Sequence, residues 1–281
     1  MSLLRPRAIF ALVALAALAA CTGAVEEPPT PPVAEVVKPE PAHISPEELA
    51  KDADNIALVP SPAEMQKALT AAGIQAKLGE KVPNRTLKMD VPNKDQVAVR
   101  TGVILADLLL TVKTAEKEAL AKQLLDIKTG MEQLGAGSDI GATVQDLHDR
   151  VMNDAVSRDD LVKELDELSG AIIPEIEYEA GPRSVPLIQA GSWLGGANLV
   201  AGAVIEAGSY EKAGDLLKQP AVVNYFQGYV KGEGQDKASG EVIAQLETTL
   251  NTLAEICAHE TLSEEDVKTI QSSTASVLDL L

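Results

Sequence analysis

One carboxylate in this chain stands where a charged side chain is unexpected. Asp107 interrupts a run from Val97 to Val112 that is apolar almost all round. A buried carboxyl group has a raised pKa unless it is paired or hydrogen-bonded, and such groups occur at functional sites. We therefore expect Asp107 to make a structural hydrogen bond or to face a cleft between helices. The alternative is a polar contact at the bottom of a ligand pocket, together with Gln189, Trp193 or Asn198.

A cysteine and a histidine near the C-terminus form a candidate pair for nucleophilic catalysis. Cys257 and His259 are two residues apart, however, and such positions on a helix point to different faces. Cys257 also continues an apolar stripe. The pattern therefore favours a buried, inert cysteine.

Metal-ligating residue types gather in two short clusters, which are Glu255, His259 and Glu260, and Asp146, His148 and Asp149. Neither cluster has a second histidine, and the chain has no HExxH or calcium-loop pattern. It also lacks the GxSxG, P-loop and dinucleotide-binding motifs. We predict no catalytic residues, no metal and no cofactor, and hence a protein that is not an enzyme.

The elements that must position these residues are helices. Apolar residues recur at steps of three and four, in stripes that run over residues 120–134, 140–151, 161–172, 243–257 and 267–281. Capping signals precede several helices, at Ser61-Pro62-Ala63-Glu64, at Asn93 with Gln96, and at Ser263 with Asp266. No alternation predicts a strand. Because each stripe covers only about two heptads, we predict an all-α, multi-helix antiparallel bundle or array rather than a long coiled coil.

The segment from Ser184 to Ile205 has no charged residue and is long enough to suggest a transmembrane helix. Pro186 and several polar residues lower the hydrophobicity of the segment, and glycine is frequent in it. Gly191, Gly195 and Gly202 instead predict a central helix whose neighbours approach closely. The segment from Gly79 to Pro92 is predicted to be a polar loop.

The N-terminus has the features of an export signal. Arg5 and Arg7 precede an uncharged run, Ala8–Ala20, that is too short to span a bilayer. Leu18-Ala19-Ala20-Cys21 resembles a bacterial lipobox. The resemblance implies a lipoprotein signal peptide over residues 1–20, cleaved before a lipidated Cys21. Thr22, where enterobacterial sorting would need aspartate to keep a lipoprotein in the inner membrane, favours the outer membrane. An ordinary secretory signal is the alternative.

The next segment, residues 21–45, is rich in proline and glutamate and has no apolar periodicity. Proline favours extended, solvated polyproline II, so we predict a disordered tether. At about 3.1 Å per residue it would hold the body up to roughly 75 Å from the lipid. The helical domain is then predicted over residues 46–281.

Charge excludes some classes of partner. The full chain has 24 Lys and Arg and 42 Asp and Glu, so removing Arg5 and Arg7 with the signal peptide leaves 22 against 42, or −20. This excess opposes nucleic-acid binding and docking on anionic lipid headgroups. Few aromatic residues are present, which disfavours a carbohydrate site.

Several landmarks resemble an uncharacterised family of all-helical, secreted or lipid-anchored proteins common in Bacteroidetes. They are Pro60-Ser61-Pro62-Ala63-Glu64, Gly102 to Asp107, and Ala190-Gly191-Ser192-Trp193. The resemblance covers roughly Leu58 to the end. It implies a helical fold but brings no activity, cofactor or catalytic residues.

Together these features predict a lipoprotein of the bacterial cell envelope, held by its N-terminal lipid to the outer membrane and facing the periplasm. We expect a non-catalytic binding or scaffolding module, with another envelope protein as a candidate partner. The first alternative is a periplasmic small-molecule-binding helical domain. An enzyme is the third.

Overall fold

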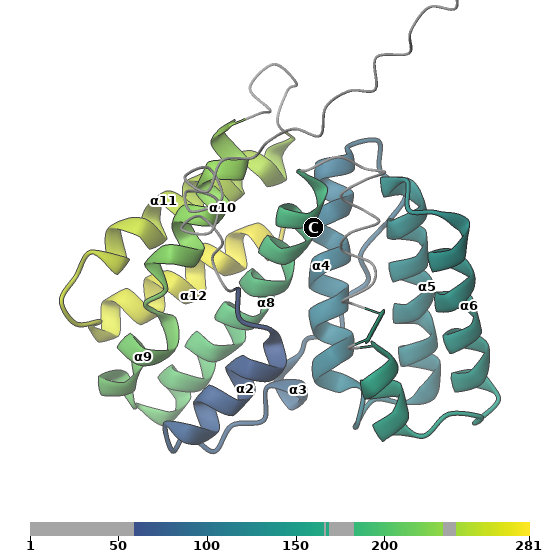
Figure 1. Ribbon diagram of the computed structural model, residues 1–281. Coiled ribbons are helices and arrows are strands. Elements are labelled where there is room, and N and C mark those ends of the chain that lie inside the picture. The colour runs from purple at the N-terminus through teal and green to yellow at the C-terminus, as the bar shows by residue number, and fades with distance from the viewer. Residues whose placement is uncertain (1–58, 166, 169–182, 233–239) are drawn as a thin grey trace, which may run out of the picture. The chain divides into compact units, whose positions relative to one another are not determined.

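Helices are the only regular elements among the residues that the structure, a computed structural model, describes: 59–165, 167–168, 183–232 and 240–281 (Figure 1). These residues belong to one compact unit, Ser45–Leu281. The predicted all-α class is confirmed. The predicted signal peptide, Cys21 and the tether lie outside the described residues.

The described chain begins with α2 (Pro62–Ala71) and a single helical turn, α3 (Leu78–Lys81). The predicted capping box is present, because the Glu64 amide donates to Oγ of Ser61 at 3.2 Å and the Ser61 amide donates to Oε2 of Glu64 at 2.7 Å. The prediction of a loop from Gly79 was wrong for residues 79–81. Leu78 is fully buried, and its amide donates to Oε1 of Gln66 at 2.7 Å, which holds this turn against α2.

Two helices, α4 (Lys94–Thr111) and α8 (Ser184–Ala207), lie side by side at the centre of the fold (Figure 1). Asn93 caps α4 as predicted, with its Oδ1 accepting from the Gln96 amide at 3.2 Å. By length and composition alone α8 could cross a membrane, but 72% of its most apolar window is buried inside the protein. This burial agrees with the predicted central helix.

Glycine residues allow the backbones of α4 and α8 to approach each other closely. A Cβ atom on Gly191 would overlap the carbonyl oxygen of Val99, and one on Gly102 would overlap the carbonyl oxygen of Ile188. Each helix therefore presents a glycine to the backbone of the other. The prediction that Gly191 lies where a neighbouring backbone approaches is confirmed.

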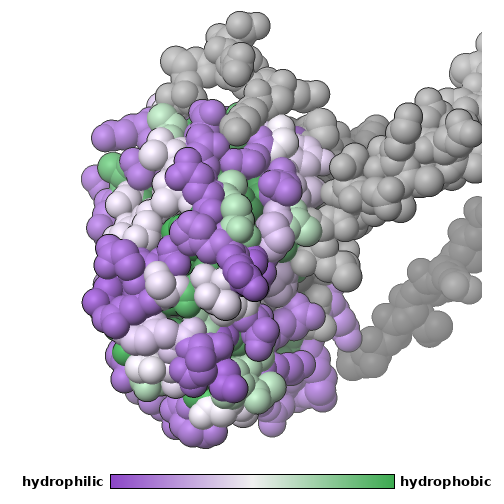
Figure 2. All heavy atoms as spheres, turned by 90° about the vertical axis from the view of Figure 1, so that its left-hand side faces the viewer, coloured by the Kyte–Doolittle hydropathy of each residue, from purple (hydrophilic) through white to green (hydrophobic). Residues whose placement is uncertain are grey.

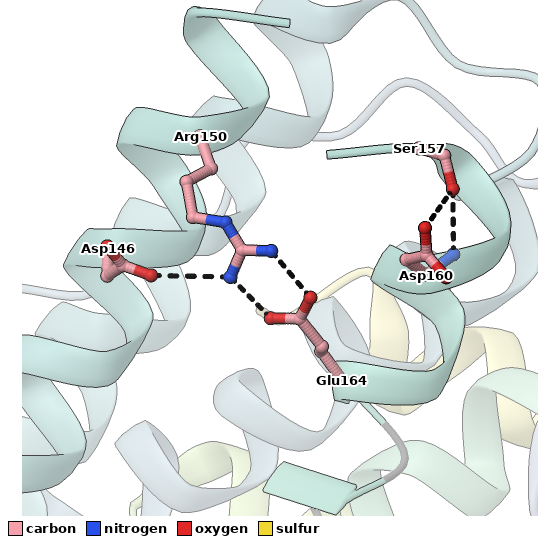
Figure 3. Close-up of polar contacts among 5 residues, drawn as sticks. All are labelled: Asp146, Arg150, Ser157, Asp160 and Glu164. Carbon is pink, nitrogen blue, oxygen red and sulfur yellow. Dashed lines mark hydrogen bonds and ion pairs between the residues drawn. The ribbon is translucent and has the colours of Figure 1, made fainter. Parts of the chain in front are cut away.

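On one side of this pair lie α5 (Lys117–Leu134), α6 (Ser138–Met152) and a further helical segment, 158–165. Their predicted apolar stripes are buried within the described range except for Leu168, which is partly buried. Figure 3 shows how α6 is joined to the segment that follows: the Arg150 guanidinium donates to both carboxylate oxygens of Glu164, at 2.6 Å each. Ser157 caps that segment, accepting from the Asp160 amide at 3.1 Å.

On the other side lie the 3₁₀ turn η1 (Tyr210–Lys212) and the helices α9 (Ala213–Leu217), α10 (Pro220–Gly232), α11 (Glu241–Cys257) and α12 (Glu264–Leu278). Pro220 is the first residue of α10, where its missing amide hydrogen is tolerated. Ser263 and Asp266 form the predicted capping box of α12. Phe226 packs at a ring-centroid distance of 5.7 Å from Trp193 and so joins α10 to α8.

Candidate functional site

Asp107 is buried on α4, with 3% of its surface exposed. Its one described ionic partner is Arg85, whose Nε lies 3.0 Å from Oδ2. Arg85 comes from the segment that connects α3 to α4. The contact lacks the alignment of a hydrogen bond, because Nε of Arg85 has no hydrogen-bond acceptor among the described residues. Arg85 and Asp107 therefore form an ion pair in which Nε of Arg85 and Oδ1 of Asp107 make no hydrogen bond to the described residues.

The two side chains line a pocket of about 220 Å³ between three segments. Residues 82–87 form one wall, Ile104, Asp107 and Thr111 of α4 form the second, and residues of α5 from Ala119 to Asp126 form the third. The wall residues of α4 and α5 recur at steps of three and four, so each set lies on one helix face. The pocket combines apolar walls with a buried carboxylate, as small-molecule sites do.

Two buried oxygen atoms of this pocket have no hydrogen-bond donor among the described residues. They are Oδ1 of Asp107 and Oε1 of Gln123. A buried acceptor without a donor loses about 1–3 kcal/mol relative to its solvated state, and more when it is charged. Four buried side-chain polar atoms of the described residues lack a hydrogen-bond partner, and three of them belong to residues of this pocket: the two oxygens and Nε of Arg85. The unsatisfied polar groups of the described fold are therefore concentrated here.

Charge in the pocket is balanced between two pairs. Lys122 Nζ lies 2.6 Å from Oδ2 of Asp126 on α5, and Arg85 lies beside Asp107. Burial raises the pKa of Asp107 to about 6, although the Arg85 guanidinium acts in the opposite direction. Desolvation of the carboxylate has the larger effect on its pKa because Asp107 is almost fully buried. Arg85 attracts it through a single contact, from Nε to Oδ2, that is not aligned as a hydrogen bond.

The other three predicted site residues have partners elsewhere. Gln189 Oε1 accepts from the Tyr225 hydroxyl at 3.0 Å, and Trp193 Nε1 donates to Gln219 Oε1 at 2.8 Å. Asn198 Nδ2 donates to the Gln271 carbonyl oxygen at 2.9 Å. These contacts join α8 to the helices that follow it. The described contacts therefore do not bring Asp107 together with the three residues of α8.

The rotation of α4 explains this separation. At about 100° per residue, Val99, Gly102 and Ala106 form the face directed at α8, and Ile104, Asp107 and Thr111 form a face about 140° away. The glycine contacts with Ile188 and Val99 hold α4 in this rotation. Asp107 is thereby directed at α5 and at residues 82–87 instead of at α8.

Arg85 and Gln123 were missed as candidate site residues in the sequence. Arg85 lies in a polar loop without periodicity, so no local pattern marks it. Gln123 lies on α5 beside the stripe residue Leu124, where a polar residue normally faces solvent. The only local signal is the i, i+3, i+4 and i+7 spacing of Ala119, Lys122, Gln123 and Asp126, which places them on one helix face.

Two other cavities are less suited to a polar ligand. One of about 10 Å³, lined by Trp193 and Cys257 among others, is too small. A groove of about 340 Å³ is lined by Val59, Glu64 and Gln219 among others. Two of its polar side chains are engaged, because the exposed Glu64 caps α2 and the partly buried Gln219 accepts from Trp193. The Asp107 pocket differs from both in its unpartnered buried oxygens.

The second predicted candidate, Cys257, is only half-buried at the end of α11. Burial raises the pKa of its thiol. A hydrogen bond with the backbone of Gln219 and the positive charge of Lys218 act in the opposite direction, but their effect is smaller. Nδ1 of His259 lies 3.0 Å from Oδ1 of Asp266 instead. The arrangement keeps Cys257 in the thiol form at neutral pH, which is the less reactive form.

This environment predicts slow chemistry at Cys257. In the Cys21→Ser chain, where Cys257 is the only thiol, we expect Ellman's reagent at pH 7.5 to react severalfold more slowly than after unfolding in urea. The rate is measured by absorbance, with a Cys257→Ser chain as blank. Equal rates in the folded and unfolded chains would contradict an inert thiol.

The two clusters of metal-ligating residue types are not assembled into sites. Within the described ranges, no three His, Cys, Asp or Glu side chains are placed to hold a metal ion together. Nδ1 of His148 lies 2.8 Å from Oδ1 of Asp149 and 3.2 Å from Nε2 of Gln145, all on α6. These are contacts within one helix surface.

Comparison with known proteins gives no further indication of function: no protein-family model, no curated protein and no solved structure matches the chain.

Proposed function

We propose that this chain is a lipid-anchored protein of the bacterial cell envelope whose helical domain binds a small polar molecule without transforming it. The observation that carries the proposal is the pocket between α4, α5 and residues 82–87, in which Oδ1 of Asp107 and Oε1 of Gln123 are buried without a donor. A ligand with hydrogen-bond donors would satisfy both.

The surface of the domain supports a small ligand over a scaffold for an apolar partner. The face over α9 and α11 is mostly hydrophilic where it is coloured, with small, scattered apolar areas (Figure 2). Among the described residues the large exposed apolar side chains are Leu125, Met152 and Tyr229, each less than 40% exposed. Docking surfaces for apolar partners are usually contiguous patches of several hundred Å².

The chemistry of the pocket supports binding over catalysis. Its described lining includes no cysteine, histidine or serine that Asp107 would activate as a nucleophile. Thr86 and Thr111 contribute hydroxyl groups. Oγ1 of Thr111 donates to the backbone carbonyl of Asp107 at 2.7 Å, and Thr86 is exposed on the segment that connects α3 to α4. These groups can orient a ligand, and they leave no activated nucleophile against it.

The membrane anchor gives a direct prediction. We expect Cys21→Ser to move the protein from the membrane to the soluble fraction of the envelope, because the acyl chains are its proposed hold on the bilayer. Fractionation and immunoblotting measure this, with Cys257→Ser as the matched control that stays on the membrane. Wild-type protein that is already soluble would contradict the anchor.

The ligand proposal is tested by a thermal-shift screen of small polar molecules against the purified Cys21→Ser chain. Each compound that raises the midpoint of unfolding is tested again on Ala119→Phe, which fills the pocket from an exposed position of α5, and on Ala221→Phe, an exposed position of α10 outside it. The proposal expects Ala119→Phe alone to abolish the shift. No hits, or hits that Ala119→Phe leaves unchanged, would overturn it, and crosslinking for a protein partner would follow.

A further inference from the structure

We infer that the ligand carries a primary ammonium group, which it presents to Oδ1 of Asp107 and Oε1 of Gln123. The inference rests on the proposed function of the Asp107 pocket and names the class of molecule that this pocket accepts.

Three buried polar atoms of the pocket residues lack a hydrogen-bond partner among the described residues: Nε of Arg85, Oδ1 of Asp107 and Oε1 of Gln123. Nε of Arg85 is a donor that already lies 3.0 Å from Oδ2 of Asp107 in an ion pair. The two oxygens are acceptors without any such contact, so a ligand that satisfies them must supply donors. An ammonium group carries three N–H donors on a compact centre, whereas a hydroxyl group supplies one and a carboxylate supplies none. Hydrogen bonds from a cation to a carboxylate are also about twice as strong as neutral ones.

The charges around the pocket also favour a cation. The basic groups of the pocket are already engaged, Lys122 with Asp126 and Arg85 with Oδ2 of Asp107. An anionic ligand would have to displace one of these contacts and would face the free oxygen of a carboxylate. The acidic excess of the chain, 42 Asp and Glu against 24 Lys and Arg, also attracts small cations and repels anions.

The size and the lining of the pocket favour a small ligand with an apolar body. The pocket, at about 220 Å³, is smaller than the roughly 300–1,000 Å³ of sites for drug-sized molecules. Leu87, Ile104 and Ala119 give it apolar walls beside the two oxygens. These properties fit a compact hydrocarbon body with one ammonium head. Cyclohexylammonium is a suitable probe, and cyclohexanol and cyclohexanecarboxylate are its uncharged and anionic counterparts.

Binding of such a cation would be linked to protons. It requires ionised Asp107, and the pKa of this group is raised to about 6 in the free protein. The other charged groups that face the pocket are Arg85, Lys122 and Asp126. With that pKa, about a quarter of the protein is ionised at Asp107 at pH 5.5, so cyclohexylammonium should bind about fourfold more weakly there than at pH 7.5.

The test is isothermal titration of the three probes into the Cys21→Ser chain at both pH values. The same titrations are made with Asp107→Asn, which keeps the shape and removes the charge, and with Gln123→Met, which removes the second acceptor at similar size. Gln145→Met, at a partly buried position of α6 outside the pocket, is the matched control. We expect cyclohexylammonium to bind tightest, about tenfold more weakly to Asp107→Asn, and unchanged to Gln145→Met.

Two results would overturn the inference. If cyclohexanol or cyclohexanecarboxylate binds as tightly as the amine, and Ala119→Phe abolishes that binding, the pocket binds ligands of another class and the proposed function stands. If cyclohexylammonium does not bind, or binds equally to wild type, Asp107→Asn and Gln123→Met, the ammonium assignment is wrong. The library screen then decides separately whether the pocket binds any small molecule.

Discussion

Gly191→Ala lowers the free energy of unfolding by about 3 kcal/mol or more, because the added methyl group would overlap the backbone of α4. The atom in its way is the carbonyl oxygen of Val99, with the Val99 carbonyl carbon at 2.9 Å from the position of the new Cβ. A backbone atom inside a central helix cannot rotate aside as a side chain can. The two helices must therefore separate along their contact.

The measurement is urea unfolding of the Cys21→Ser chain, followed by circular dichroism and by the fluorescence of Trp193, the single tryptophan. Gly228→Ala is the matched control, since Gly228 is exposed within α10 and a Cβ there would meet no atom within 4 Å. It should stabilise the chain by about 0.5–1 kcal/mol through helix propensity. Similar effects of the two substitutions would contradict the close approach of α4 and α8.

The pH dependence of stability at Asp107 is the second large effect. Its pKa is about 6 in the folded chain and about 3.8 in the unfolded chain, so between these values the folded state binds the proton more tightly. Stability due to this group is therefore greatest at low pH, falls as pH rises from about 4 to about 6, and is constant above. A shift of this size corresponds to about 3 kcal/mol.

Asp107→Asn isolates this contribution. The free energy of unfolding of wild type minus that of Asp107→Asn should decrease by about 2 kcal/mol from pH 4 to pH 7, which is most of the full shift. Asp159→Asn is the control of opposite sign, because the hydrogen bond from Lys113 lowers the pKa of that exposed carboxylate. A difference at Asp107 that rises with pH would show that the attraction of Arg85 exceeds the desolvation of the carboxylate.

Much of the helical architecture is predictable from local patterns. Ser61 with Glu64, Asn93 with Gln96, and Ser263 with Asp266 each mark a helix start that the structure confirms. The stripe from Leu120 to Leu134 is buried along its length, and α5 ends at Gly135, whose φ is +99°. These signals are reliable because capping groups and stripe neighbours lie within four residues of one another.

The candidate site is predictable only in part. Asp107 is conspicuous because a carboxylate among apolar residues must find an unusual environment. Its neighbours in space carry no such signal. The predicted grouping with Trp193 and Asn198 relied on two central helices lying side by side, which they do, but adjacency leaves open which face of α4 meets α8.

Helix boundaries, the all-α class and the central position of α4 and α8 are properties of residue type and spacing, since each depends on groups a few positions apart. The set of residues that line the pocket depends on how α4 is rotated about its own axis. Because Gly102 and Gly191 let the two backbones meet, Asp107 is directed away from α8, towards Arg85 from an irregular segment and Gln123 from α5. The packing of whole helices, which no local pattern encodes, therefore decided which polar groups share the site.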